Sequence, residues 1–473
     1  MMRRGAGSLA VVMLLAGCSG SSDPEPAPSS ASPPVFKPGA DGAGDPYFPK
    51  YGNGGYDVAG YDLNLKYEPD SGRLSGTATI TATATQDLSR FNLDLAHLKA
   101  SQVTVDGAAA TSAAQGNELV ITPAAGISTG REFTVVVTYA GVPGQLENET
   151  LGEGGWLRTA DGAIALGQPE SASTWYPVND HPSDKAVFKL AMTVPDGVEA
   201  ISNGVPGERE TAGGWTTWRW SENSPMASYL STVVIGQYRI TTGTHAGKPM
   251  ITAVPDSLPA DGPAAKSMAM TGEVTDFLVS QFGPYPFGAN GGVVVDEDKV
   301  RYALETQARP VYGNTFFGGG VNPSVVAHEL AHQWFGDSLA LDRWQDIWLN
   351  EGFATYAEWL WSEHEGDATA QQIFDRTYRA FDWSEPPGDP GPNRIFGTAV
   401  YQRGGMTVHA LRRTIGDDAF FKLVKSWAAE HRDGNVTTDQ FIAAAESASG
   451  KNLDKFFQDW LFGTKRPPIP KSA

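Results

Sequence analysis

The sequence predicts an α+β protein with an N-terminal antiparallel β-sheet domain followed by a mainly helical domain. From Tyr51 to about Ile240, apolar and polar residues alternate with a period of two, which is typical of strands that bury one face. From about residue 246 onward, apolar residues increasingly recur at the spacing of helices. The chain has 473 residues, of which 41% are hydrophobic, so it is long enough for two or three domains with substantial cores.

The strands of the first domain follow from local patterns. Residues 77–85 alternate Thr with Ala or Ile, and residues 91–95 repeat this period. Residues 133–139 are rich in β-branched and aromatic side chains, which favour strands. Asp-Gly pairs, which favour tight turns, occur at 106–107, 161–162 and 196–197. We therefore expect a large antiparallel sheet.

The second domain is expected to contain a short apolar strand at residues 293–295 and several helices. Helical periodicity predicts five helices, over residues 264–282, 323–335, 347–363, 400–414 and 438–448. The second of these has clear ends, since Asn322 is a good N-cap, Pro323 suits the first turn and Gly336 suits the end.

The N-terminus has the pattern of a targeting segment. Basic residues precede the apolar run Leu9–Ala16, which is too short to span a bilayer as a helix, so residues 1–17 are expected to be a signal peptide. Leu-Ala-Gly-Cys at its end resembles the bacterial lipobox, in which the cysteine is lipidated. Cys18 is the only cysteine, so no disulfide forms within the chain. We expect an extracytoplasmic, membrane-anchored lipoprotein; the alternative is a secreted protein with an incidental cysteine.

The expected domain plan follows from these signals. After the signal peptide come a flexible Pro/Ser/Gly-rich tether (18–45), a β domain (46–245), a helical domain (246–463) and a tail (464–473). The formal net charge of −19 argues against nucleic acid as a partner, because phosphate binding needs clustered Lys and Arg.

The helix predicted over residues 323–335 contains His328-Glu329-Leu330-Ala331-His332. Histidines four residues apart lie on one helix face, so both imidazoles can bind one metal ion. Zinc lowers the pKa of a bound water towards about 7, and a nearby carboxylate can take the proton as the water attacks a carbonyl. The motif predicts one Zn²⁺ per chain, with Glu329 as general base.

A catalytic zinc usually has three protein ligands and one open position. A third histidine at position 338 would indicate a metzincin, but Ser338 stands there, and Phe335 replaces the glycine of that motif. The next expected helix offers Glu351, 19 residues after His332, a spacing that fits a helix, a turn and an antiparallel return. The predicted ligands are therefore His328, His332 and Glu351. The alternative is a pair of helical histidines that pack or face solvent.

These motifs resemble the M1 family of zinc aminopeptidases, which are gluzincins. Residues 328–337 are similar to the zinc helix of the family, and residues 348–354 to its third-ligand segment. The resemblance covers about residues 50–465. It implies a saddle-like N-terminal sheet domain, a thermolysin-like catalytic domain, and peptides as substrates.

The resemblance also implies three further site residues. Residues 302–306 stand where the family has Gly-Ala-Met-Glu-Asn, so Glu305 would pair with the free α-amine of the substrate. Gln168 precedes residues 175–182, which resemble a family segment near which a Gln or Glu also holds the amine. Tyr401, in Tyr-Gln-Arg-Gly, matches the Tyr-x-Lys-Gly of the family and would donate to the tetrahedral oxyanion.

Some residues depart from the family pattern. Tyr302 replaces Gly, Leu304 replaces Met and Thr306 replaces Asn, which leaves the side-chain preference of the substrate pockets open. The chain ends just after the expected thermolysin-like domain, so we expect a short form without the small β domain and the large helical domain of longer members, and with a more open site.

The expected function is that of a zinc aminopeptidase tethered to a membrane. Two alternatives remain open. One is a zinc hydrolase with another substrate, such as an epoxide or the interior of a peptide. The other is an inactive surface binding protein on a peptidase scaffold.

Overall fold

The computed structural model describes residues 35–148 and 152–471. The expected signal peptide, Cys18 and the tether up to residue 34 lie outside these residues, so the lipoprotein hypothesis stays a prediction. No helix in the described part of the chain combines the length and the hydropathy needed to cross a membrane.

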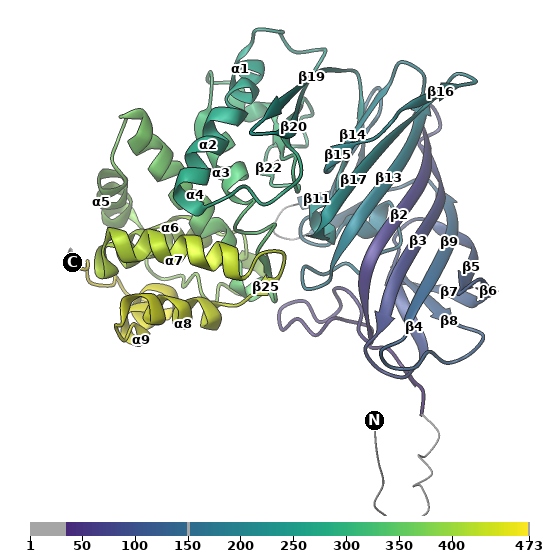
Figure 1. Cartoon of the computed structure of the whole chain (residues 1–473), viewed down its shortest axis with the longest axis horizontal. Helices are drawn as coiled ribbons and strands as arrows, with labels where there is room; N and C mark the ends of the chain where they lie inside the picture. Colours follow the sequence, from purple (N-terminus) through teal and green to yellow (C-terminus); the bar gives the residue numbers. More distant parts are fainter. Residues whose placement is uncertain (1–34, 149–151, 472–473) are drawn as a thin grey trace, which may run out of the picture. The chain divides into compact units, whose positions relative to one another are not determined.

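A nine-stranded sheet dominates the N-terminal part (Figure 1). Its path runs in the order β15 (Val205–Pro206), β17 (Trp215–Ala227), β13 (Lys185–Pro195), β2 (Tyr56–Glu68), β3 (Arg73–Ala84), β9 (Glu132–Gly141), β5 (Lys99–Val105), β6 (Ala108–Ala109), with β16 (Glu210–Ala212) also on β17. Every pairing is antiparallel except that of β13 with β2. The period-two pattern is confirmed in β2, where Leu63 and Leu65 are buried while Asp62 and Asn64 are exposed.

Two smaller sheets complete the N-terminal part. One has the order β1 (Lys37–Pro38), β4 (Leu88–Asp94), β8 (Glu118–Thr122), β7 (Thr111–Gln115). The other has the order β10 (Gln145–Asn148), β11 (Gly152–Arg158), β12 (Ala163–Leu166), β18 (Val233–Gly236), β14 (Glu199–Ser202). The three predicted Asp-Gly turns lie between β5 and β6, β11 and β12, and β13 and β14.

A mixed five-stranded sheet opens the second part. Its order is β19 (Tyr238–His245), β20 (Lys248–Pro255), β21 (Asn290–Val295), β23 (Val311–Gly313), β22 (Ala303–Leu304). The boundary expected at residue 245 falls at the first hairpin of this sheet, because β19 pairs with β20 and not with the large sheet. Ala246 and Gly247 join them as a two-residue hairpin loop with φ of 47° and 78°, the geometry of a type I′ turn.

Helices make up the rest of the second part and gather on the side away from the large sheet (Figure 1). They are α1 (Pro263–Ala269), α2 (Thr271–Phe282), α3 (Pro323–Ala331), α4 (Trp348–Glu365), α5 (Ala370–Ala380), α6 (Gly404–Ile415), α7 (Asp417–Glu430), α8 (Thr438–Ser449) and α9 (Asp454–Phe457). A π-helical turn, Ala399–Arg403, precedes α6, and a short parallel pair joins β24 (Ala340–Leu341) to β25 (Asn435–Val436).

Two helix predictions differ from the structure, and other helices were not predicted. The helix expected over residues 264–282 breaks at Met270 into α1 and α2. The helix expected to reach residue 335 ends at Ala331, with His332 as its C-cap. Helices α5 and α7 were not predicted, although α5 buries Ala370, Phe374 and Tyr378 on one face. Polar residues separate these three apolar positions, so the narrow apolar face of α5 was not recognised in the sequence.

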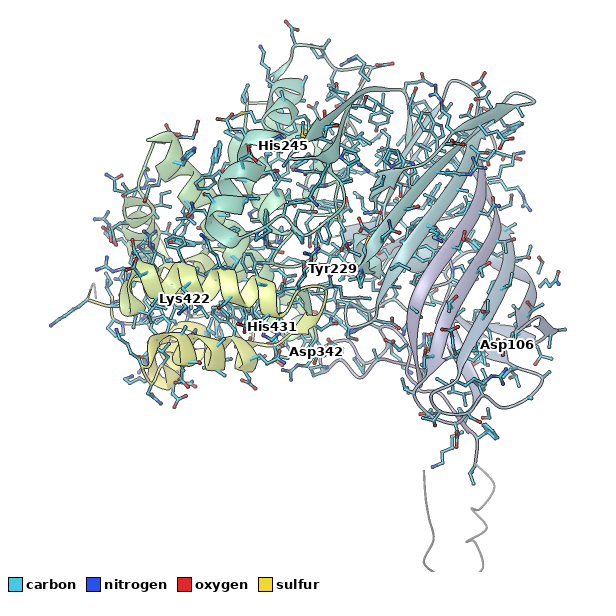
Figure 2. The ribbon with its side chains drawn as sticks, viewed as in Figure 1. Asp106, Tyr229, His245, Asp342, Lys422 and His431 are labelled. Atoms are coloured by element: carbon cyan, nitrogen blue, oxygen red, sulfur yellow. The ribbon has the colours of Figure 1, made fainter. Side chains whose placement is uncertain are left out.

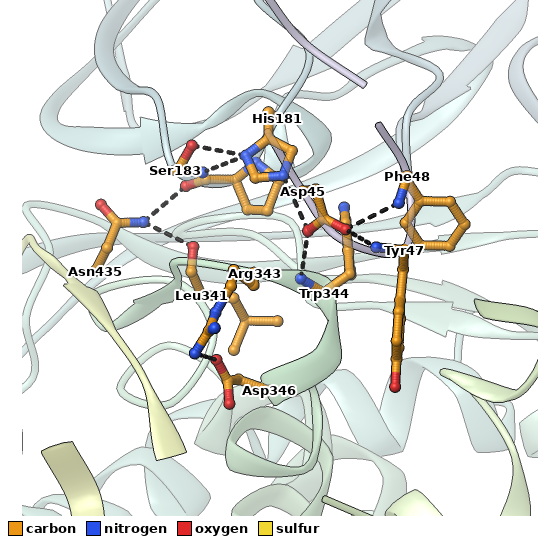
Figure 3. Close-up of polar contacts among 11 residues, drawn as sticks. Asp45, Tyr47, Phe48, His181, Ser183, Leu341, Arg343, Trp344, Asp346 and Asn435 are labelled. Atoms are coloured by element: carbon orange, nitrogen blue, oxygen red, sulfur yellow. Dashed lines mark hydrogen bonds and ion pairs between the residues drawn. The ribbon is translucent and has the colours of Figure 1, made fainter. Parts of the chain in front are cut away.

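Asp45 joins the N-terminal segment to both parts of the protein (Figure 3). One carboxylate oxygen accepts a hydrogen bond from Trp344 N at 2.9 Å and lies 3.3 Å from His181 Nε2. The other oxygen accepts from the backbone N–H groups of Tyr47 and Phe48. Burial opposes ionisation, but these donors hold the pKa of Asp45 below its usual value. The end of the segment expected to be a flexible tether is therefore packed, as is β1 against β4.

Candidate zinc and substrate site

Helices α3 and α4 bring the three predicted zinc ligands together. His328 lies on α3, His332 caps its end, and Glu351 lies in the first turn of α4. The distance from Glu351 Oε2 to the Nε2 atom of each histidine is 3.4 Å. Among the described residues, groups of three or more possible metal ligands occur only at this site.

The geometry of these ligands fits a zinc ion. Tetrahedral coordination with bonds of 2.0–2.1 Å separates neighbouring ligand atoms by about 3.3 Å, close to the distances found here. Glu351 Oε2 is buried and has no hydrogen-bond partner among the described residues, which is the state expected of an atom reserved for a metal. The donor set of two imidazoles and one carboxylate is typical of catalytic zinc.

Two further contacts orient the histidine ligands. Glu358 Oε1 lies 2.7 Å from His328 Nδ1, and the carbonyl oxygen of Phe335 lies 3.0 Å from His332 Nδ1. Each contact leaves Nε2 facing the metal position. Glu358 was not predicted from the sequence. Its signal was the seven-residue step from Glu351, which places both carboxylates on one face of α4.

Glu329 lies beside the ligands, as predicted for a general base. Its carboxylate, that of Glu305 and a ring nitrogen of His332 offer atoms within 4.8 Å of one another. Burial raises the pKa of Glu329 to about 8, although the neighbouring histidines oppose the rise. A carboxylate in this environment can take up a proton near neutral pH.

Glu305 and Gln168 meet in the same cavity. Gln168 Nε2 donates to Glu305 Oε1 at 3.1 Å, although 137 residues separate them. Burial raises the pKa of Glu305, while the charge of His332 opposes the rise. Tyr229, which the sequence did not indicate, is buried next to Glu305 between the strands and the helices (Figure 2). A buried carboxylate with one oxygen held by an amide can pair with a cation.

Tyr401 lies in the π-helical turn before α6 and lines the same cavity. Its ring stacks near His328, with centroids 6.1 Å apart and planes 21° apart. Burial, and after it the carboxylates of Glu351, Glu305 and Glu329, raise the pKa of Tyr401 well above its usual value. The phenol therefore keeps its proton and can act as a hydrogen-bond donor.

One cavity of about 430 Å³ contains all seven predicted site residues of the folded chain. These are Gln168, Glu305, His328, Glu329, His332, Glu351 and Tyr401. Its remaining wall includes Tyr302, Phe316, Asn322 and Val325. A buried His-His-Glu set with a carboxylate and a phenol around one cavity is the arrangement of a zinc hydrolase.

Comparison with known proteins identifies the family. The Peptidase M1 N-terminal domain matches residues 58–230, and the Peptidase family M1 domain matches residues 321–460. The structure is similar to the crystal structure of the M1 zinc metallopeptidase from Deinococcus radiodurans, with 30% identity, a TM-score of 0.83, and coverage of 91% of this chain and 99% of that chain. The chain therefore belongs to peptidase family M1, and the resemblance inferred from the sequence is confirmed.

Some further relatives are similar to this chain in length, and others are much longer. A mutant of the Deinococcus radiodurans enzyme bound to a Tyr-Ser-Ala substrate is 29% identical, with a TM-score of 0.83 and coverage of 91% of this chain and 100% of that chain. Aminopeptidase N of Streptomyces lividans is 25% identical over 332 residues, which are 62% of this chain and 38% of that protein. Aminopeptidase M1 of Arabidopsis thaliana is 25% identical over 331 residues, 65% of this chain and 37% of that protein. The chain spans half or less of the length of such relatives.

Proposed function

We propose that this protein is an aminopeptidase that removes N-terminal residues from peptides. The observation that carries the proposal is the Glu305–Gln168 pair, which lies in the zinc cavity and not on the outer surface. Peptides bear a positive charge at a free N-terminus, and a carboxylate fixed near the metal selects that end by a charge-assisted hydrogen bond. An enzyme that cleaves inside peptides has no need of such an acceptor.

The residues around the cavity have different roles in hydrolysis. Zinc, when bound by His328, His332 and Glu351, supplies Lewis-acid chemistry that polarises the scissile carbonyl and acidifies water. Glu329 takes the proton from the attacking water and can return it to the leaving amine. The phenol of Tyr401 donates a hydrogen bond to the oxygen that becomes negative in the tetrahedral transition state.

Blocking the N-terminus of the substrate tests the exopeptidase assignment. We expect purified protein to cleave an aminoacyl chromogenic substrate with a free amine, and acetylation of that amine to leave only a small residual rate of cleavage. Equal rates on the free and acetylated substrates would instead support an endopeptidase. A panel of such substrates, assayed with and without a chelator, also reveals the preferred N-terminal residue.

Substitution of the proposed base tests the chemistry itself. Glu329→Gln keeps the size of the side chain and removes its ability to accept a proton, so we expect activity to fall by about 10²- to 10⁴-fold. Zinc content measured on the same sample is the control. Activity equal to that of the wild type would contradict the mechanism, and a zinc-free, inactive wild type would support the binding-protein alternative.

We propose separately that Cys18 carries a lipid and anchors the protein outside the cytoplasm. The support is the Leu-Ala-Gly-Cys sequence after a short apolar run, with no other cysteine in the chain. Metabolic labelling with a radioactive fatty acid should mark the wild-type protein and not Cys18→Ser. Release of unlabelled wild-type protein into the medium would instead indicate secretion.

A further inference from the structure

The residues that directly follow Glu305, Thr306 to Arg309, form a tight turn with one strained residue. Arg309 N donates to Thr306 O at 3.0 Å, and the Thr306 hydroxyl donates back to Arg309 O at 2.6 Å. Between them, Ala308 has a φ of 64°, a left-handed conformation that costs a non-glycine residue about 1 kcal/mol or more. Such a turn persists when contacts from the surrounding structure hold it in place.

Gln333 holds this turn from the side of the zinc ligands. It follows His332 directly in the sequence, and its side chain is fully buried. Its Nε2 donates to Glu305 O at 3.1 Å, and its Oε1 accepts from Ala308 N at 2.7 Å. The two polar atoms of the Gln333 amide therefore connect Glu305, which faces the substrate, with Ala308, the strained residue of the turn.

The same amide also reaches the backbone of the proposed base. Gln333 Nε2 lies 3.4 Å from Glu329 O, the carbonyl one helical turn earlier. Because the donor group is shared between Glu329 and Glu305, the position of the turn depends on the position of the zinc helix. The side chain of Gln333 makes no contact with the substrate cavity.

The N-terminal part holds the opposite side of the turn. Arg309 is fully buried, donates to the carbonyl oxygens of Ser202 and Gly204, and lies over the ring of Trp220 at 4.8 Å. Asn203 Nδ2 donates to Gln307 O at 2.9 Å. The N-terminal part therefore holds the turn on one side, and Gln333 holds it on the side of the zinc ligands.

We propose that Gln333 is a positioning residue that fixes the distance between the Glu305 carboxylate and the zinc ligands. This inference rests on the proposed aminopeptidase function. In an aminopeptidase, that distance decides which peptide bond reaches the metal once the α-amine is held. Loss of the Gln333 bridge lets the turn shift, and a misplacement of about 1 Å can cost about 10²-fold in rate. The Gln333 bridge thus places the first peptide bond of the substrate at the metal, so that cleavage releases one N-terminal residue.

Two substitutions of Gln333 test this role, together with a matched control. Gln333→Glu keeps the acceptor for Ala308 N and removes the donor for Glu305 O, whereas Gln333→Leu removes both. Asn290→Asp is the control, since Asn290 is also a buried amide, donating to Thr275 Oγ1 at 2.7 Å and accepting from Gly291 N. It lies outside the substrate cavity.

The readout is the ratio of kcat/KM for a free-amine substrate to that for its N-acetylated form, measured with zinc content and Tm. We expect both Gln333 variants to retain zinc and to lower this ratio by about 10- to 100-fold, through loss of rate on the free-amine substrate. We also expect them to release some dipeptide from a tetrapeptide. Asn290→Asp should lower Tm and keep the ratio of the wild type.

The outcomes separate this inference from the proposed function. A wild type that shows no preference for the free amine would contradict the aminopeptidase function. A wild-type preference that persists in both folded, zinc-bound Gln333 variants would overturn the positioning role alone. Loss of zinc or of folding in both variants would assign Gln333 to the stability of the zinc helix and would equally overturn it.

Discussion

Gln168 and Glu305 form a hydrogen bond of 3.1 Å that joins the N-terminal β-sheet part to the zinc cavity. Gln168 follows β12 of the N-terminal part, whereas Glu305 follows β22 of the second part. The proposed amine site is therefore shared between the two parts. The N-terminal part then contributes to substrate recognition as well as to folding.

Substitutions of this pair should have graded effects on free-amine substrates. Charge-assisted hydrogen bonds contribute about 1.5–3 kcal/mol, so Glu305→Gln should lower kcat/KM by about 10- to 150-fold. A neutral hydrogen bond contributes about 0.5–1.5 kcal/mol, so Gln168→Ala should cost about 2- to 10-fold. Steady-state kinetics measures both effects. A larger loss in Gln168→Ala than in Glu305→Gln would show that Gln168 is the main amine acceptor.

Removal of the Tyr401 hydroxyl should slow the chemical step. Tyr401→Phe keeps the ring that stacks near His328 and deletes only the proposed oxyanion donor. Loss of one such donor costs about 10²- to 10³-fold in kcat, and KM should change little. Steady-state kinetics on a zinc-loaded sample measures this effect. A variant with unchanged kcat would remove Tyr401 from the mechanism.

Glu358 should control zinc affinity. Its Oε1 lies 2.7 Å from His328 Nδ1, and its Oε2 accepts from Ser324 Oγ at 2.9 Å. Loss of such a supporting contact typically weakens metal binding by 10- to 100-fold, so Glu358→Ala should lose zinc at lower chelator concentrations than the wild type. Competition with a chromogenic chelator measures this change. Glu365→Gln, an exposed position at the end of the same helix, is the control and should bind zinc as the wild type does.

The sequence sufficed for the zinc ligands because their geometry is local. The i, i+4 spacing of His328 and His332 places both on one helix face, and the step to Glu351 needs only a second, antiparallel helix. The strands were predicted from period-two alternation for the same reason. Residues whose positions follow from the regular spacing within a helix or a strand were thus the easiest to identify.

Contacts between distant segments were not visible in the sequence. Tyr229 lies beside Glu305 because the two parts of the chain pack together, and Gln333 reaches Ala308 because the end of α3 packs against the turn that follows β22. The hairpin over Ala246 and Gly247 was not predicted, because positive φ at a non-glycine residue has no clear sequence signal. Glu305 and Gln168 were proposed from family resemblance, and spacing alone would not have paired them.

Buried carboxyl groups should make the stability of the N-terminal part fall as pH rises. Burial, together with the nearby charges of Asp180 and Glu118, raises the pKa of Glu170 to about 9, and burial raises the pKa of Asp184 to about 8. Both acids are protonated in the folded protein and ionised in the unfolded chain between about pH 4.5 and these values. The unfolded chain binds fewer protons in this window, so each group lowers stability by up to about 1.4 kcal/mol per pH unit.

Urea unfolding at several values between pH 5.5 and 8.5 measures this slope. Glu170→Gln imitates the protonated acid, so the free energy of unfolding of this variant should depend less steeply on pH, and the variant should gain most over the wild type at the alkaline end. Glu430→Gln, at an exposed position on α7, is the control and should keep the slope of the wild type. If Glu170→Gln and the wild type lose stability in parallel across this range, Glu170 is already ionised in the folded protein, and the assigned burial effect is wrong.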